Sequence, residues 1–148
     1  QNGRITPLKT RGITAMSGAF GYEMDLGKCT AEEKTEIRCQ VEQYKTYYDL
    51  LHHGDYYRLT SPLKDSSYTA WEQVSPDQRE ALVNVILGTT HAAPPFRCLR
   101  LKGLNPAFQY QINGTGSPQS GEVLMKAGYP VPQIQGDYPA FQIYLKAM

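Results

Sequence analysis

The sequence has few cysteines, no long apolar run and almost no net charge. Cys29, Cys39 and Cys98 are odd in number and far apart, so they predict neither a disulfide framework nor a zinc knuckle. No run approaches the roughly 18 apolar residues of a membrane-spanning helix, and no apolar leader opens the chain. A net charge of +1 gives no broad attraction for nucleic acid or anionic membranes. These absences argue against nucleic-acid and membrane partners, and scattered thiols favour the cytoplasm.

What the sequence does contain suits a folded chain. Hydrophobic residues make up 41% and charged residues 20% of the 148 positions, a balance typical of globular proteins. This length fits one modest domain, or one small domain with a fragment of another. The residue pattern changes near position 54, so we divide the chain into residues 1–54 and 55–148.

Residues 1–54 have the pattern of one strand followed by one long helix. Residues 13–22 are uncharged and rich in small side chains, which predicts a strand buried on both faces. A helix over 31–53 is predicted to start at Thr30, which can form a capping box with Glu33, and to end with Gly54 in the left-handed conformation. One strand and one helix do not make a sheet, so this unit is not expected to fold alone. The predicted apolar face of this helix consists of Ile37, Val41, Tyr44, Tyr48 and Leu51.

Residues 55–148 show no further long helical period. Short apolar or aromatic runs occur at 56–59, 68–74, 81–88, 97–101, 108–112 and 141–147. Two segments between runs have the composition of tight turns, Ser75-Pro76-Asp77-Gln78 and Asn113-Gly114-Thr115-Gly116. Runs at this spacing predict a small antiparallel sandwich or barrel.

Glu23 and Asp25 are the sharpest candidates for chemistry. In an extended chain both would point to one side, with Cβ atoms about 7 Å apart, which is near the carboxyl separation used in glycoside hydrolysis. The alternative is that they cap or anchor the loop before Thr30. We favour this alternative, because glycosidase carboxylates normally come from different strands of a scaffold.

Histidine and aromatic residues offer weaker signals. His52 and His53 are adjacent and would point about 100° apart on a helix, so even with His91 they make poor joint metal ligands. No metal and no cofactor are predicted. The single tryptophan, Trp71, and neighbouring tyrosines could stack on sugar rings, but packing in a core or an interface is the commoner role.

Short segments along almost the whole chain are similar, in consistent order, to one enzyme family. They resemble the segment that ends the barrel of bacterial α-galactosidases of glycoside hydrolase family 36, and the domain that follows it. The N-terminal matches are Gly3-Arg4-Ile5-Thr6-Pro7-Leu8, Arg11-Gly12 and Phe20-Gly21-Tyr22-Glu23-Met24-Asp25-Leu26. The later ones are Gln40, Tyr44-Lys45, Leu50, residues 54–59, Ala70-Trp71, residues 95–97, residues 101–104 and residues 121–125 with Gly128.

The resemblance implies a fold. The family has an N-terminal β domain, a central (β/α)8 barrel and a C-terminal β-sandwich. Residues 1–54 would then be the last strand–helix unit of the barrel, and residues 55–148 the C-terminal domain. The implied fold class is mainly β, with a C-terminal antiparallel β-sandwich preceded by one strand and one long helix.

The resemblance also implies an activity for the intact protein. The family hydrolyses terminal α-galactosides such as melibiose and raffinose with retention, through two aspartates on earlier barrel strands. Neither surrounding motif occurs in this sequence, so no catalytic residue is assigned. Tyr22 and Glu23 would lie near the barrel mouth, as candidates for the rim of the substrate site.

The expected partners are the remainder of the α-galactosidase chain, an α-galactoside substrate and further copies in a homo-oligomer. For residues 55–148 the leading hypothesis is a structural role on the barrel, in stability or oligomerisation. The alternative is an accessory carbohydrate-binding module that uses Trp71 and neighbouring tyrosines.

Overall fold

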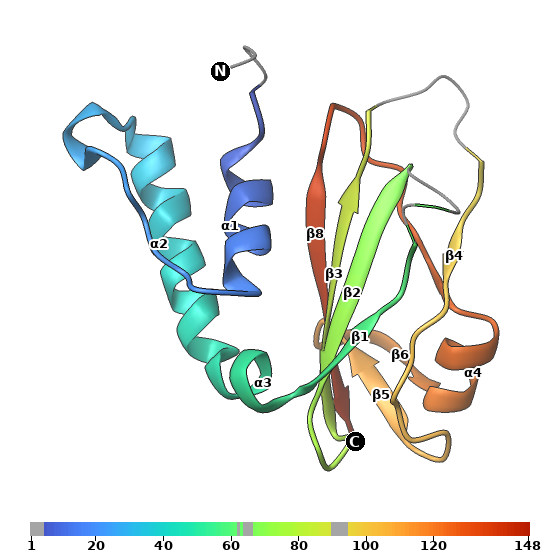
Figure 1. The fold of residues 1–148 in the computed structure, drawn as a ribbon. Helices are drawn as coiled ribbons and strands as arrows, with labels where there is room; N and C mark the ends of the chain where they lie inside the picture. Colours follow the sequence, from blue (N-terminus) through green and yellow to red (C-terminus); the bar gives the residue numbers. More distant parts are fainter. Residues whose placement is uncertain (1–4, 62, 64–66, 90–94) are drawn as a thin grey trace.

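The computed structural model describes residues 5–61, 63, 67–89 and 95–148 (Figure 1). The helices are α1 (Leu8–Met16), the short 3-10 helix η1 (Leu26–Lys28), α2 (Ala31–Thr46), α3 (Tyr48–His53) and α4 (Gly121–Lys126). The strands are β1 (Asp55–Arg58), β2 (Tyr68–Val74), β3 (Glu80–Leu87), β4 (Cys98–Leu99), β5 (Gln109–Ile112), β6 (Thr115–Ser120), β7 (Tyr129–Pro130) and β8 (Ala140–Ala147).

The strands form two antiparallel sheets. A six-stranded sheet has the order β1-β2-β3-β8-β5-β6, and β4 pairs with β7 in a second, two-stranded sheet. The mainly β, antiparallel, sandwich-like fold predicted from the sequence is confirmed, and each of the six predicted runs contains a strand. The sequence reasoning missed β6, β7 and α4.

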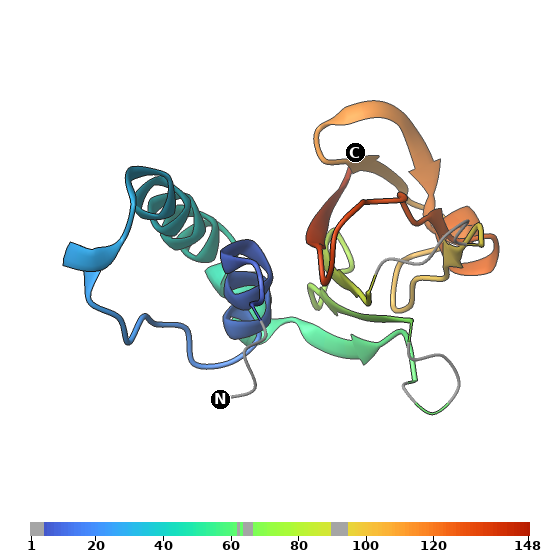
Figure 2. The same cartoon turned by 90° about the horizontal axis from the view of Figure 1, so that it is seen from above.

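The main hydrophobic core lies on the face of the large sheet that is covered by β4, β7 and α4. Alternation along each strand produces it, because every second side chain points to this face. Helices α1, α2 and α3 lie on the other side of the large sheet (Figures 1 and 2). The core residues are Ala70, Val74, Ala81, Val83, Val85, Leu99, Leu101, Leu104, Tyr110, Ile112, Leu124, Val131, Ile143 and Leu145.

The helical side of the sheet is buried as well, and α1 is fastened to it. Ile13 of α1 packs with Trp71 and Ala140 in a second apolar cluster. The Trp71 indole N–H donates to Ser17 Oγ at 2.7 Å, and the Thr10 hydroxyl donates to the Tyr138 carbonyl at 2.6 Å. Residues of α1 and of the turn that follows it are therefore tied to Trp71 and Tyr138, which come more than fifty positions later.

The strand predicted at residues 13–22 is wrong. Residues 8–16 form α1, with Thr10, Gly12, Ile13 and Met16 buried, and no regular structure is assigned from Phe20 to Asp25. The helix has Pro7 at its N-cap position without a capping side chain, and its Thr, Gly and Ile residues have modest or poor helix propensity. Packing on the sheet, which local sequence does not report, stabilises it.

The predicted long helix is confirmed in part. Thr30 and Glu33 form the complete capping box. The helix is interrupted at Tyr47, so that α2 and α3 are separate, and Gly54 is extended (φ −74°, ψ 150°) rather than left-handed. Its predicted apolar face is half exposed: Ile37, Val41 and Tyr44 are partly buried, and Tyr48 remains 47% exposed.

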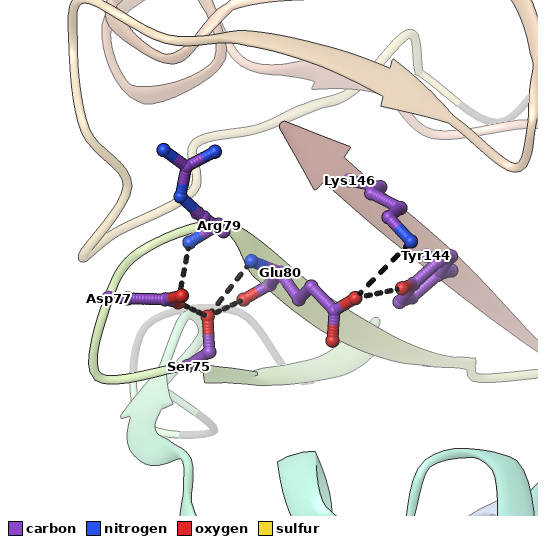
Figure 3. Close-up of polar contacts among 6 residues, drawn as sticks. All are labelled: Ser75, Asp77, Arg79, Glu80, Tyr144 and Lys146. Atoms are coloured by element: carbon purple, nitrogen blue, oxygen red, sulfur yellow. Dashed lines mark hydrogen bonds and ion pairs between the residues drawn. The ribbon is translucent and has the colours of Figure 1, made fainter. Parts of the chain in front are cut away.

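Both predicted turns join neighbouring strands of hairpins. In the β2–β3 turn the Ser75 hydroxyl donates to Asp77 Oδ1 at 2.6 Å and accepts the Glu80 N–H at 2.9 Å (Figure 3). In the β5–β6 turn Asn113 and Gly114 both have positive φ angles, of 49° and 69°, the requirement of the tight turn that asparagine and glycine favour.

Candidate functional site

The loop that contains Tyr22 and Glu23 runs the length of α2 before it enters η1 (Figure 1). Its position is fixed by one buried glutamine. The Tyr22 hydroxyl donates to Gln40 Oε1 at 2.6 Å, and Gln40 is only 2% exposed. The Gln40 carboxamide in turn donates to Glu36 Oε1 at 2.8 Å and to the Leu8 carbonyl at 3.2 Å. Gln40 thus connects this loop, α1 and α2.

Gly12 makes room for this connection. A Cβ atom at Gly12 would overlap the Gln40 carboxamide, so α1 and α2 can approach only where residue 12 has no side chain. Burial, and then the charge of Glu36, raise the pKa of Tyr22. Its hydroxyl therefore stays a neutral donor over the whole physiological range. The sequence offers one signal for this pairing. Gln40 lies within the apolar pattern of a helix, and a buried polar side chain normally has a hydrogen-bond partner.

The two candidate carboxylates have different surroundings. Asp25 is the N-cap of η1: its Oδ1 accepts the Gly27 N–H at 2.9 Å, with Lys28 Nζ 3.8 Å from Oδ2. This confirms the capping interpretation for Asp25. Glu23 is exposed, and it makes no hydrogen bond or ion pair to another residue that the structure describes. The structure therefore gives Asp25 a structural contact and leaves Glu23 free to meet a ligand.

An aromatic groove lies beside Tyr22. Phe20 packs on Tyr22 and Tyr44, with ring centroids 5.3 and 4.7 Å apart, and Tyr44 packs on Tyr48 at 5.7 Å. Together with Val41 and Asp49, these rings line an open hollow of about 650 Å³. The groove exposes apolar surface on the outer side of α2.

His52, one of the residues weighed as metal ligands, has other contacts. His52 Nε2 lies 2.8 Å from the Tyr44 hydroxyl oxygen, and its ring packs on Tyr48 with centroids 4.2 Å apart. His91 lies outside the described residues. Over the described ranges, no three His, Cys, Asp or Glu side chains gather in a geometry that could hold a metal ion.

Trp71 does not present its ring to solvent. It is 7% exposed, packed under α1, and its indole N–H donates to Ser17. The hypothesis that Trp71 stacks on sugar is therefore wrong, and the packing interpretation is confirmed. Strand β2 is covered on both faces, which the sequence pattern did not reveal.

No helix in the described part of the chain has the length and apolar character to cross a bilayer.

Comparison with known proteins assigns the family. Residues 68–145 match the model of the glycosyl hydrolase family 36 C-terminal domain, and residues 1–54 match the melibiase model. The chain belongs to glycosyl hydrolase family 36 and matches the C-terminal portion of its α-galactosidases.

Several relatives match almost the whole chain. It is 43% identical to alpha-galactosidase AgaA of Geobacillus stearothermophilus, over 100% of this chain and 20% of that protein. It is 42% identical to the bifunctional alpha-galactosidase/sucrose kinase AgaSK of Mediterraneibacter gnavus, over 96% of this chain and 15% of that protein. The chain thus spans about a fifth or less of these relatives.

Solved structures agree. The galactosidase domain of AgaSK superposes with a TM-score of 0.95 at 40% identity, covering 100% of this chain and 20% of that one. A variant of AgaA from Geobacillus stearothermophilus in complex with raffinose superposes with a TM-score of 0.94 at 41% identity, with the same coverage.

Proposed function

We propose that this chain is the C-terminal part of a retaining α-galactosidase that hydrolyses terminal α-galactosides of the melibiose and raffinose type. In this proposal the chain is not catalytic by itself. It packs on the catalytic barrel and supports stability or oligomerisation. The family assignment and the raffinose bound by the AgaA variant support the substrate class. The free thiols of all three cysteines agree with a cytoplasmic enzyme.

One observation carries the structural role: the first 54 residues have surfaces that lack a partner. The N–H groups of residues 19–24 make no backbone hydrogen bond to any described residue. The apolar face of α2, with Ile37, Val41 and Tyr44, is half exposed, and it continues into the groove next to Tyr22. Unpaired backbone beside exposed apolar surface is normally covered in a native protein. We propose that residues 1–54 complete the barrel, with residues 19–24 in place of 13–22 as its last strand.

Residues 55–148 would then be the C-terminal domain that holds this barrel unit in position. The contacts of Trp71 with Ser17 and Ile13, and of Tyr138 with Thr10, cross the proposed boundary. Without the sheet, the buried side chains of α1 would face water. The β domain is therefore a support for the last part of the barrel.

Deletion of residues 60–148 from the intact enzyme is expected to leave a poorly soluble or inactive protein. Galactose release from raffinose and melibiose is the assay, with soluble yield measured in parallel. The intact enzyme should be active, and the isolated 148-residue chain should release no galactose. An active, equally stable truncation would contradict the supporting role, and an intact protein without α-galactosidase activity would contradict the proposed function itself.

Tyr22 and Glu23 are proposed to lie on the rim of the substrate site. Glu23→Gln in the intact enzyme is expected to raise KM for galactosides about threefold to tenfold, the net size of one ordinary hydrogen bond. Tyr22→Phe should raise KM as well and should also lower stability, because Gln40 Oε1 loses its donor. Steady-state kinetics measure both effects.

Glu42→Gln is the matched control, because Glu42 is an exposed carboxylate of α2 paired with Lys45 at 2.9 Å. It should leave KM unchanged. Unchanged kinetics in the Glu23 and Tyr22 variants would remove the rim assignment.

A further inference from the structure

A second groove lies at the corner where α2 meets α3. It is an open hollow of about 530 Å³ between this corner, β8 and the β5–β6 hairpin. Its volume is in the range of small-ligand sites. The lining consists of Tyr47, Gln111, Asn113, Gly114, Tyr144, Lys146, Ala147 and Met148.

Two tyrosines form an aromatic floor in this groove. The rings of Tyr47 and Tyr144 lie with centroids 5.2 Å apart and planes inclined by 34°. The Tyr144 hydroxyl donates to Glu80 Oε1 at 2.8 Å, which fixes the ring, as Figure 3 shows. Burial raises the pKa of both tyrosines, so their hydroxyls stay neutral. The floor is thus held in place before any ligand arrives, which lowers the entropic cost of binding.

Amide groups stand at the edge of this floor. The Gln111 side chain donates through Nε2 to the Gly116 carbonyl at 2.9 Å, and its Oε1 has no partner among the described residues. Asn113 Oδ1 accepts the Tyr144 N–H at 2.8 Å, which locks the hairpin against β8. The edge therefore offers uncharged polar atoms in fixed positions.

Lys146, the charged side chain in the groove lining, is paired with an anion. Lys146 Nζ lies 3.8 Å from Glu80 Oε1 (Figure 3), so one cation and one anion stand side by side. A phosphate or a nucleic acid would find no excess positive charge here. Aromatic faces bordered by amides and without net charge suit a neutral, polyhydroxylated ligand, because the apolar faces of sugar rings pack on aromatics and their hydroxyls bond to amides.

We propose that this groove is a second carbohydrate-binding site, separate from the catalytic barrel, for neutral oligosaccharides with α-galactosyl units. The choice of ligand class rests on the proposed function, and the site itself rests on Tyr47, Tyr144 and Gln111. Such a site would hold an oligosaccharide on the enzyme surface while another is cleaved. It replaces the surface around Trp71 as the place for sugar binding.

The test uses the intact enzyme with its active site saturated by 1-deoxygalactonojirimycin, a compound found bound to an AgaA variant. Stachyose is then titrated and its binding followed by saturation-transfer NMR and calorimetry. The expected result is residual stachyose binding that Tyr47→Ala and Gln111→Ala each weaken about fivefold, the size of one lost aromatic or amide contact.

Tyr56→Ala is the matched control, because Tyr56 is a 56% exposed tyrosine of β1 outside the groove. It should leave stachyose binding unchanged. Gln111→Ala removes a surface amide and spares the aromatic packing, so it tests the site even if Tyr47→Ala lowers stability. No stachyose binding to the inhibitor-saturated enzyme, or binding that neither groove variant weakens, would overturn the proposal. Raffinose hydrolysis by the same preparation without inhibitor reports separately on the proposed function.

Discussion

Replacement of Trp71 by alanine is expected to lower the free energy of unfolding by about 3–5 kcal/mol, the usual cost of truncating a buried large aromatic residue. The Trp71 side chain of β2 faces α1 and packs against Ile13 and Ala140. The substitution leaves a cavity at this contact and removes the donor to Ser17 Oγ. Because α1 has no capping side chain of its own, we expect it to loosen first.

Urea unfolding of the 148-residue chain measures this effect. Far-ultraviolet circular dichroism is the suitable probe, since the substitution removes the single tryptophan. Tyr56→Ala on the exposed side of β1 is the control and should change the unfolding free energy by less than about 0.5 kcal/mol. A loss below about 1 kcal/mol for Trp71→Ala would show that α1 does not depend on this contact.

The contrast between α1 and α2 shows how far the sequence alone could lead. Helix α2 begins where Thr30 and Glu33 satisfy each other's backbone groups, a local signal that two residues three positions apart carry. Helix α1 carries no such signal, and its stability comes from residues such as Trp71 and Tyr138, which are distant in sequence. Local patterns therefore predicted the start of α2 and mistook part of α1 for a strand.

The β domain was predictable for a related reason. Hairpin turns at 75–78 and 113–116 are specified by the residues in the turns themselves, and the strands follow from alternation on either side. The burial of both faces of β2 was not predictable, because it depends on α1 and on the loop at 101–104.

The same difference between local and long-range contacts applies to the candidate sites. Asp25 was correctly expected to cap its own loop, since a cap is a local contact. The buried Gln40, which orients Tyr22, and the pairing of Tyr47 with Tyr144 depend on contacts between distant elements. Sequence reasoning singled out Glu23 by its spacing from Asp25 and Tyr22 through family resemblance, and the place of both on the barrel rim stays a prediction.

Glu72 provides the second large expected effect, a stability that falls as the pH rises from about 4.5 to about 8. Its carboxyl group is completely buried on the core face of β2. Oε1 accepts the Lys102 N–H at 2.5 Å, and Oε2 has no hydrogen-bond partner among the described residues. Burial raises the pKa of Glu72 from 4.5 to about 8, against the smaller opposing effects of the Lys102 N–H and the Lys102 charge.

The direction of this pH dependence follows from proton binding in the folded and the unfolded chain. The folded chain holds the Glu72 proton more tightly than the unfolded chain, so between pH 4.5 and 8 the folded state binds more protons. Each pH unit in this window then removes up to about 1.4 kcal/mol from the free energy of unfolding. Local relaxation reduces this limit, and we expect a total loss of about 2–3 kcal/mol. The lowered pKa values of Glu32, Asp77 and Glu122 act in the opposite direction, below this window.

Glu72→Gln should remove this dependence. The glutamine keeps the shape of the side chain and an acceptor for the Lys102 N–H, and it has no proton to lose. The variant should match the parent chain near pH 5 and exceed its unfolding free energy by about 2–3 kcal/mol at pH 8. Urea unfolding at half-unit steps from pH 5 to 8.5 measures both curves.

Glu122→Gln is the control for this series, because it removes an exposed carboxylate that pairs with Lys126 at 2.6 Å. Its curve should run parallel to that of the parent chain through the whole window. If the Glu72→Gln curve also ran parallel, the buried carboxyl would have to be ionised in the folded state. Oε2 would then need a donor that reaches it from solvent, and the core at the loop 101–104 would be open to water. A flattened curve would instead show that the protein keeps an uncharged carboxylic acid in its core at neutral pH, held by one backbone N–H.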